Sequence, residues 1–344
     1  MSMSTRSRTR SRGRRQSPAP APAAADGQQA GGAAAAAAGP RWIAAVPILR
    51  RGADRPLWML IPCAVAMAIV VLIPVILVVA LSLLNLNIGT LHEWLAAPFI
   101  GIRNYVSAFT QKSVIGTSAG NAILLSVGFS LLTTIVITPV GVLAAIAVHR
   151  PFRGRAVVRA LYLVPYIIPT FVTALVARIM FLNHYGLVDK ALAALHIASV
   201  NTYWLLGSHS FWAMTLTEMW AAWPFIYLMT LAGLQSVPRE QYEAAVLDGA
   251  APAQTLRRVV LPQLSGILKL AVVLSTLYHL GNFTLAYVMF PSPPPQSVDV
   301  LPIDMYYRAF STYDFGVASA IAVITIVIFL IPVYSYLRLT RMSD

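Results

Sequence analysis

Residues 57–84 read LWMLIPCAVAMAIVVLIPVILVVALSLL, a run of 28 residues without a single charged side chain. A helix of about 20 apolar residues crosses the hydrocarbon core of a bilayer, so this stretch predicts a membrane span. Five further long apolar stretches follow. We therefore expect an all-α, polytopic membrane helix bundle with six transmembrane helices, at about 57–84, 119–148, 156–182, 210–236, 264–290 and 315–338.

The composition supports the same class. Hydrophobic residues make up 58% of the 344 residues and charged residues only 11%, whereas about 25% of the residues in ordinary soluble domains are charged. The single cysteine, Cys63, lies inside the first expected span, so no disulfide framework is available. These features exclude an ordinary soluble domain.

The basic residues indicate how the chain is oriented. If the N-terminus is cytoplasmic, the inside segments beyond residue 40 carry 13 arginines, at positions 41, 50, 51, 55, 150, 153, 155, 159, 239, 257, 258, 338 and 341. The outside segments carry four basic residues, Arg103, Lys112, Lys190 and Arg308. Cytoplasmic loops of membrane proteins are enriched in Lys and Arg, so both termini are expected in the cytoplasm.

Residues 1–56 differ in character from the rest. Six of the first 15 residues are arginine, and a Pro/Ala-rich stretch follows. Such a segment cannot form a hydrophobic core, so we expect a disordered cytoplasmic tail. Anionic membrane lipid is the expected partner of its arginines, rather than nucleic acid. The permease domain is then expected to cover residues 57–340.

Residues 237–262 form a cytoplasmic loop between the fourth and fifth spans. Pro238 suits the first turn of a helix, and Gly249 permits a turn that other residues resist. A second short helix is expected to begin near Pro252 and to stop at Pro262. In the first helix Tyr242, Ala245, Val246 and Gly249 share one face, as a docking surface requires.

This loop resembles the EAA motif of binding-protein-dependent ABC importer permeases. The matching residues are Glu243, Ala244 and Ala245, then Gly249, then Leu261 and Pro262 at the end. Asp248 before the glycine resembles the carbohydrate branch of the family, the maltose- and glycerol-phosphate-like permeases, and Val259 stands where isoleucine is usual. The resemblance implies the type I ABC importer permease fold, with these residues in the coupling helix that docks on the ATP-binding subunit.

The resemblance also implies a function and a set of partners. It identifies the chain as the permease subunit of an importer for a sugar or sugar-like solute, in the bacterial plasma (inner) membrane. Its expected partners are a second permease, a dimer of ATP-binding subunits and an extracytoplasmic solute-binding protein. The segment Pro291–Ser297 departs from the family's usual Gly-Gly-Pro loop, so the contact with the solute-binding protein is expected to differ.

The chain carries no phosphate-binding Gly-rich loop of the Walker type, so ATP and Mg²⁺ are expected on the partner ATPase and no cofactor on this chain. We expect no catalytic residues and no enzyme activity. Two alternatives remain: a permease for another small polar solute such as a polyamine, and a secondary transporter. The second would require two related halves and several coupling-ion acids at mid-membrane, whereas no internal repeat is evident and the spans hold one strong acid.

Two helix faces are candidates for the solute path. Ser275, His279 and Asn282 share one face of the fifth span, and Glu218, Ala222 and Phe225 share one face of the fourth. An acid within a membrane is rare and usually functional, although Glu218 could instead be a structural partner of Arg178. No second His or Cys stands at ligand spacing from His279, so no metal site is expected.

Overall fold

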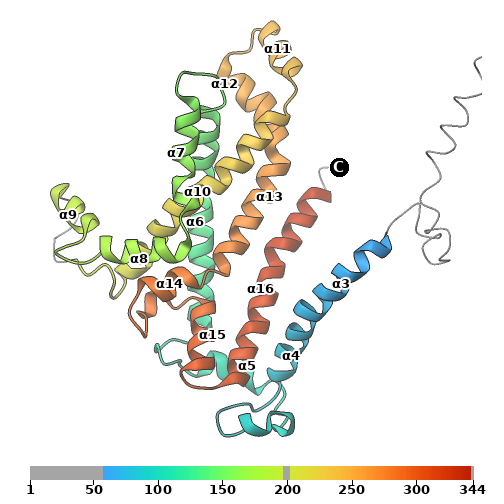
Figure 1. The fold of residues 1–344 in the computed structure, drawn as a ribbon, viewed down its shortest axis with the longest axis vertical. Coiled ribbons are helices and arrows are strands. Elements are labelled where there is room, and N and C mark those ends of the chain that lie inside the picture. The colour runs from blue at the N-terminus through green and yellow to red at the C-terminus, as the bar shows by residue number, and fades with distance from the viewer. Residues whose placement is uncertain (1–56, 197–201, 342–344) are drawn as a thin grey trace, which may run out of the picture. The chain divides into compact units, whose positions relative to one another are not determined.

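The apolar stretches fold into helices in the computed structural model, which describes residues 57–196 and 202–341 (Figure 1). Within these ranges the only β-structure is one isolated antiparallel bridge between Leu84 and Phe99, and three short 3-10 helices cover Leu57–Leu60, Leu91–Ala96 and Gln296–Val298. The predicted all-α class is therefore confirmed for the described part of the chain. The tail predicted over residues 1–56 lies outside it.

The helices are α3 (Ile61–Met67), α4 (Ile73–Leu81), α5 (Arg103–Thr110), α6 (Ala119–Ala147), α7 (Arg155–Ile167), α8 (Thr170–Met180), α9 (Leu187–Ala194), α10 (His209–Ser236), α11 (Arg239–Leu247), α12 (Pro252–Thr255), α13 (Leu261–Leu280), α14 (Thr284–Met289), α15 (Leu301–Phe310) and α16 (Phe315–Arg341). Two π-helical turns, Ala68–Leu72 and Leu256–Val260, connect α3 to α4 and α12 to α13. The chain divides between Val71 and Leu72 into two units, and the helices from α4 onward belong to the second.

α10 is the helix around which the second unit packs. It contacts α6, α7, α8 and α13, and half of its 28 residues are buried. Two glycines permit the close approach. A Cβ on Gly141 of α6 would lie 2.7 Å from the backbone nitrogen of Tyr227, and one on Gly233 would lie 2.8 Å from the Leu264 side chain. Small residues at such contacts are the usual way in which membrane helices pack closely.

Four helical stretches of the described chain are long and apolar enough to cross a membrane: Ile61–Leu81, Ala119–Ala147, Pro252–Leu280 and Phe315–Arg338. The bent pair of α7 and α8 makes a fifth if it counts as one span. α10, expected as a span over 210–236, is not among them. Because other helices enclose much of α10, its surface need not be apolar all round, and the count of six spans is not confirmed.

The third expected span is wrong in its shape. Residues 156–182 form two helices, α7 and α8, which meet at an angle of 87°. The break lies at Ile168, whose backbone is extended (ψ 125°) directly before Pro169. A proline disfavours helical geometry in the residue before it, and this accounts for the break. Pro165, by contrast, stays inside α7.

The fifth expected span is also different from its prediction. α13 ends at Leu280, and the chain turns at Gly281 before the short helix α14. The expected helix end at Pro262 is wrong, because helix continues from Pro252 to Leu280. The π-helical turn before Pro262 explains this. The Leu261 N–H donates to Leu256 O, five residues back, so the backbone hydrogen-bond pattern of the helix is already shifted at the position where proline lacks an N–H.

Candidate functional site

The two predicted solute-path faces meet inside the bundle and form a hydrogen-bonded cluster. The Asn282 side-chain amide donates to Glu218 Oε2 at 2.9 Å. His279 Nδ1 lies 3.0 Å from Glu218 Oε1, an ion-pair distance without the alignment of a hydrogen bond. On its other side, His279 Nε2 lies 3.1 Å from Ser275 Oγ. We call these four residues the Glu218 cluster.

The Glu218 cluster is almost completely buried. Glu218 and His279 are each 2% exposed, and Ser275 and Asn282 are 4% and 8% exposed. Charged groups survive at such depth only when partners satisfy them, because the cost of removing them from water is several kcal/mol per ion. The cluster meets this condition through the contacts between α10 and α13, which place His279 opposite Glu218.

A cavity of about 530 Å³ opens beside the cluster. Five of the six predicted solute-path residues line it: Glu218, Ala222, Phe225, Ser275 and His279. Asn282 does not. Its side-chain NH2 donates to the Glu218 carboxylate, and its side-chain oxygen accepts the backbone N–H of Leu285 at the start of α14. We therefore place Asn282 as a positioning residue rather than a wall of the cavity.

The sequence reasoning missed the opposite wall, which comes from the bent pair. Tyr166, Thr170 and Thr173 line the cavity there, and Tyr278 joins them from α13. The hydroxyls of Thr170 and Tyr278 are 3.5 Å apart, and the Tyr166 ring lies 6.5 Å from that of Phe225. Pro169 was the sequence signal for this wall of the cavity. It marks the bend that directs Thr170 inward, which a straight third span would not do.

The alternative pairing of Glu218 with Arg178 is not formed. Arg178 lies in the last turn of α8 and is exposed. Glu218 instead contacts His279 and Asn282 of the α13–α14 segment, at 3.0 Å and 2.9 Å. A structural role of Glu218 therefore runs through α13.

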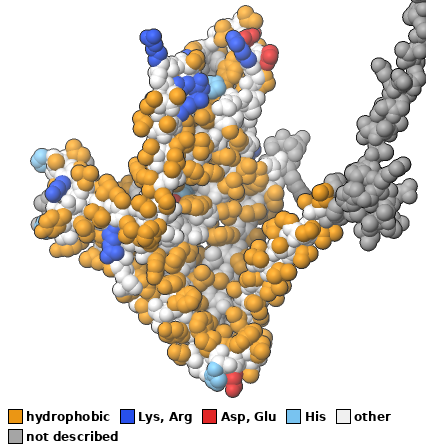
Figure 2. Space-filling view, in the orientation of Figure 1, with side chains coloured by type: hydrophobic (Ala, Val, Ile, Leu, Met, Phe, Trp, Pro, Cys, Tyr) orange, Lys and Arg blue, Asp and Glu red, His pale blue; other side chains and the backbone are white. Residues whose placement is uncertain are grey.

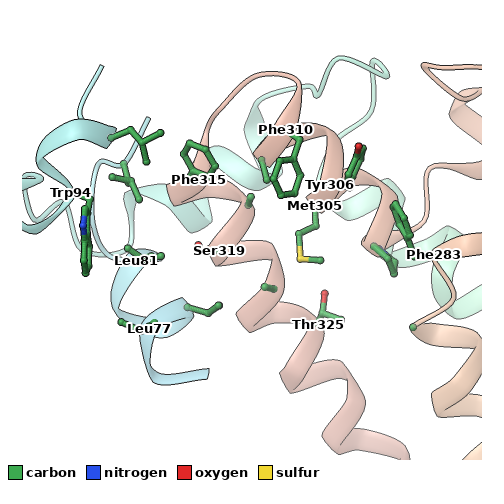
Figure 3. Close-up of a pocket in the computed structure, with 18 residues that line it drawn as sticks. Leu77, Leu81, Trp94, Phe283, Met305, Tyr306, Phe310, Phe315, Ser319 and Thr325 are labelled. Carbon is green, nitrogen blue, oxygen red and sulfur yellow. The ribbon is translucent and has the colours of Figure 1, made fainter. Parts of the chain in front are cut away.

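A larger cavity of about 820 Å³ lies between α4, α15 and α16 (Figure 3). Aromatic and aliphatic side chains surround it, including Trp94, Phe310 and Phe315, and few polar groups such as Ser319 and Thr325 are present. Such a lining offers a polar solute few hydrogen-bond partners. The smaller cavity at the Glu218 cluster is therefore the better candidate for a solute site.

In the predicted cytoplasmic loop, a short helix and a turn at Gly249 form as expected, whereas the second helix continues into α13. Gly249 follows α11 with a φ of +74°, the left-handed region that glycine adopts at little cost, and α12 starts at Pro252. Ala245 is buried against the bundle, whereas Ala244, Val246, Leu247 and Asp248 are exposed. Leu261 is half-buried and Pro262 exposed at the start of α13.

The tip of this loop is exposed and carries charged side chains. Leu247 is 87% exposed at the tip of α11, and Glu243 pairs with Arg239 of the same helix, at 2.9 Å. Figure 2 shows Lys and Arg side chains gathered at this end of the bundle, beyond a broad hydrophobic surface. The predicted docking role requires an exposed loop tip of this kind.

A second cluster of buried polar residues connects α15 to the loops that pack around it. Asp299 accepts a hydrogen bond from Thr117, and Asp304 pairs with Arg308 at 3.0 Å. Arg308 also donates to the carbonyl of Gln111. Burial, assisted by the nearby Asp304, raises the pKa of Asp299 to about 7. Sequence reasoning counted Arg308 only as an outside charge and missed this network.

Known proteins resemble the chain along most of its length. Residues 137–342 match the family described as "Binding-protein-dependent transport system inner membrane component". The trehalose/maltose transport system permease protein MalF of Thermococcus litoralis is 30% identical over 71% of this chain and 80% of that protein. The sulfoquinovosyl glycerol transport system permease protein SmoG of Agrobacterium fabrum is 29% identical over 89% of this chain and 96% of that protein.

A solved structure has the same fold. It is the crystal structure of a bacterial ABC transporter involved in the import of the acidic polysaccharide alginate, with a TM-score of 0.70 at 19% identity over 86% of this chain and 97% of that chain. This agreement supports the importer-permease fold that the loop motif implied. The family match covers more than half of the chain, and the chain belongs to the binding-protein-dependent transport system inner membrane components, a family of multi-pass transport subunits rather than enzymes.

Proposed function

We propose that this chain is the permease subunit of an ABC importer for a sugar or sugar-like solute, and that the solute passes the cavity at the Glu218 cluster. The observation that carries the proposal is the mixture of groups around that cavity. The aromatic rings of Tyr166, Phe225 and Tyr278 surround a few polar groups, Thr170, Ser275, Glu218 and His279. A sugar presents apolar faces and many hydroxyls, which such a lining matches.

The relatives support a sugar over a polyamine. MalF and SmoG are named for trehalose or maltose and for sulfoquinovosyl glycerol. A polyamine carries several ammonium groups and would need several free carboxylates. The cavity offers one, Glu218, which His279 and Asn282 already engage. A secondary transporter is disfavoured by the family itself.

The partners follow from the same proposal. The chain pairs with a second permease, with two ATP-binding subunits that hold ATP and Mg²⁺, and with an extracytoplasmic solute-binding protein. An alginate transporter of the same fold was solved in complex with a pentasaccharide-bound periplasmic protein. Both termini then lie in the cytoplasm, and the exposed face of α11 contacts the ATPase.

The connectivity suggests how ATP hydrolysis reaches the solute. α10 carries Glu218 and leads through Val237 and Pro238 into α11, and α12 leads back into α13, which carries Ser275 and His279. Both helices of the Glu218 cluster therefore lead into the loop of residues 237–262, which we call the coupling loop. A displacement of α11 by the ATPase would move the two helices against each other and change the cluster.

The test measures ATP-dependent uptake of radiolabelled maltose and trehalose by proteoliposomes that hold the complete complex. Glu218→Ala and Asn282→Ala remove one buried hydrogen-bond partner each, which costs about 1–3 kcal/mol, so uptake per assembled complex should fall roughly 5- to 150-fold. ATP hydrolysis should remain. Arg178→Ala is the matched control, because Arg178 is exposed and should leave uptake unchanged.

Two outcomes would contradict the proposal. Unchanged uptake per complex in Glu218→Ala, Ser275→Ala, His279→Ala and Asn282→Ala would place the solute elsewhere, in the partner permease. Lower yield of folded complex with normal uptake of what remains would make the Glu218 cluster purely structural.

A further inference from the structure

A separate recess of about 460 Å³ lies between the end of α6 and the coupling loop, and it shares no lining residue with the cavity at the Glu218 cluster. His149 and Arg150, which follow α6, form one side. Tyr242 and Val246 of α11 form another, and Leu256 closes it next to α12. The recess therefore joins the membrane bundle to the coupling loop.

Two polar atoms in the lining of this recess have no partner. The Tyr242 hydroxyl and His149 Nδ1 are buried, and neither has a hydrogen-bond partner among the described residues. The His149 and Tyr242 rings are stacked, with centroids 6.2 Å apart and planes at 23°. Buried polar groups are nearly always satisfied, so two unsatisfied groups side by side indicate a site for a further polar group.

The charge around the recess is positive and is not neutralised. Arg155 Nε and Arg159 Nη2 donate to the Val148 carbonyl, 2.7 Å and 3.2 Å away, and Arg150 opens on the recess itself. Within residues 57–196 and 202–341, no acidic side chain lies within 4.0 Å of these arginines. Burial and then the three arginines lower the pKa of His149, as expected in a positive field.

Helix capping alone does not explain the arrangement. Two arginines at the C-terminal end of α6 stabilise its last carbonyls, and this accounts for one contact each of Arg155 and Arg159. It leaves the Tyr242 hydroxyl and His149 Nδ1 without a partner among the described residues, and the exposed Arg150 guanidinium lies beside them in the lining. These groups can all donate hydrogen bonds, since a neutral histidine carries its proton on either nitrogen.

We propose that this recess binds a phosphate-type anion, supplied either by the headgroup of an anionic phospholipid or by a soluble phosphate. Arginine matches the geometry of phosphate oxygens, and the hydroxyl and imidazole supply further donors. The location favours such a ligand. α6 and α7 are membrane helices, and basic pockets between membrane helices at the cytoplasmic surface bind phosphorylated lipid headgroups.

A consequence rests on the proposed function. Because Tyr242 belongs to α11 and His149 follows α6, a bound anion fixes the coupling loop to the bundle. With the anion bound, a movement of α11 would be transmitted more directly to α6 and α10. Binding itself can be measured without solute or ATP, so a failure here is distinguishable from a failure of the importer assignment.

The experiment uses the full-length chain in two preparations. In detergent, its thermal denaturation midpoint is measured while inorganic phosphate replaces chloride at constant ionic strength. In nanodiscs of phosphatidylglycerol or of phosphatidylcholine, native mass spectrometry counts the lipids that remain bound. A response to phosphate alone identifies a soluble ligand, retention of phosphatidylglycerol alone identifies the lipid headgroup, and both together identify a site that accepts either.

Three variants make the result specific to the recess. Arg150→Gln and Tyr242→Phe should each weaken binding of the responding probe about tenfold, the loss for one hydrogen bond to a charged group. Tyr242→Phe should also raise the midpoint of the anion-free protein, because it removes an unsatisfied hydroxyl and keeps the ring. Arg257→Gln is the control, an exposed arginine of the same loop that does not line the recess.

The proposal is overturned if neither probe binds the unaltered chain. It is equally overturned if Arg150→Gln and Tyr242→Phe retain phosphate and phosphatidylglycerol as Arg257→Gln does, because the arginines would then attract anions only through their general surface charge.

Discussion

At the residue scale, Asp299 combines burial with a pKa in the physiological range. It is fully buried, and its pKa lies near 7 in the folded protein against 3.8 for the free side chain. The folded state therefore binds this proton more tightly than the unfolded state. The contribution to stability is complete below about pH 4 and is lost as the pH rises to about 7, at up to about 1.4 kcal/mol per pH unit.

Replacing Asp299 by Asn should remove this dependence, because an amide does not titrate and can still accept the hydrogen bond of Thr117. The denaturation midpoint of Asp299→Asn, relative to the unaltered chain, should rise between about pH 4 and about pH 7 and stay level above that. Glu93→Gln, which changes an exposed carboxylate, should follow the unaltered chain throughout. A constant difference between Asp299→Asn and the unaltered chain would show that Asp299 does not titrate in this range.

The same scale shows what spacing can and cannot predict. Glu218 and His279 were identified from their positions on two helix faces, and the structure brings them within 3.0 Å. Side-chain periodicity is reliable within one helix. Tyr166 and Thr170 were missed because their direction depends on the bend between α7 and α8, a property of two helices together. The stack of Tyr242 on His149 was missed for the same reason.

At the element scale, the coupling loop depends on the backbone of Gly249. A Cβ at this position would meet nothing within 4 Å, so space is not the constraint. The constraint is the backbone φ of +74°, because a β-branched residue in this left-handed region costs about 1–2 kcal/mol. Gly249→Val should therefore abolish ATP-dependent uptake while membrane insertion stays normal. Gly249→Asn, which tolerates this conformation, should retain most of the uptake, and equal uptake by both variants would exclude a role for the turn.

Two glycines of α6 separate close packing from helix propensity. A Cβ on Gly141 would lie 2.7 Å from the backbone of α10, whereas one on Gly128 would meet nothing within 4 Å. Gly128→Ala should stabilise the helix by up to about 1 kcal/mol, because alanine is the better helix former. Gly141→Ala should instead lower the denaturation midpoint, since the α10 backbone must move. The same sign of effect in both variants would mean that α6 and α10 do not pack as described.

The elements themselves could be predicted only in part. The apolar runs located α4, α6 and α16 because length and composition decide a membrane helix. The breaks in the third and fifth spans were missed, although Pro169 and Gly281 stand at them. Proline and glycine also occur inside helices that they do not break, such as Pro165 in α7 and Gly233 in α10. Whether such a residue bends a helix is decided by the neighbours it packs against.

At the scale of the whole molecule, the proposed importer requires the coupling loop and the loop before α15 to face opposite sides of the membrane. The distribution of basic residues predicts which side is which, because beyond residue 40 the segments expected inside carry 13 arginines and the segments expected outside carry four lysines and arginines. Gln254 in α12 and Gln296 before α15 are both exposed, so each can report the side on which its loop lies. The only native thiol, Cys63, is exposed and is first removed as Cys63→Ser.

In that background a membrane-impermeant maleimide should label Gln296→Cys in right-side-out vesicles and Gln254→Cys only in inside-out vesicles. Each variant is the control for the other, since permeabilised vesicles must label both. The reverse pattern would place the Glu243-bearing face of α11 outside the cell, where no ATPase can reach it, and the coupling role would fall with it. Labelling of both positions from one side would instead mean that the two loops lie on the same side of the membrane. In that case the helix from Pro252 to Leu280 would not span the membrane, although its length and composition permit it.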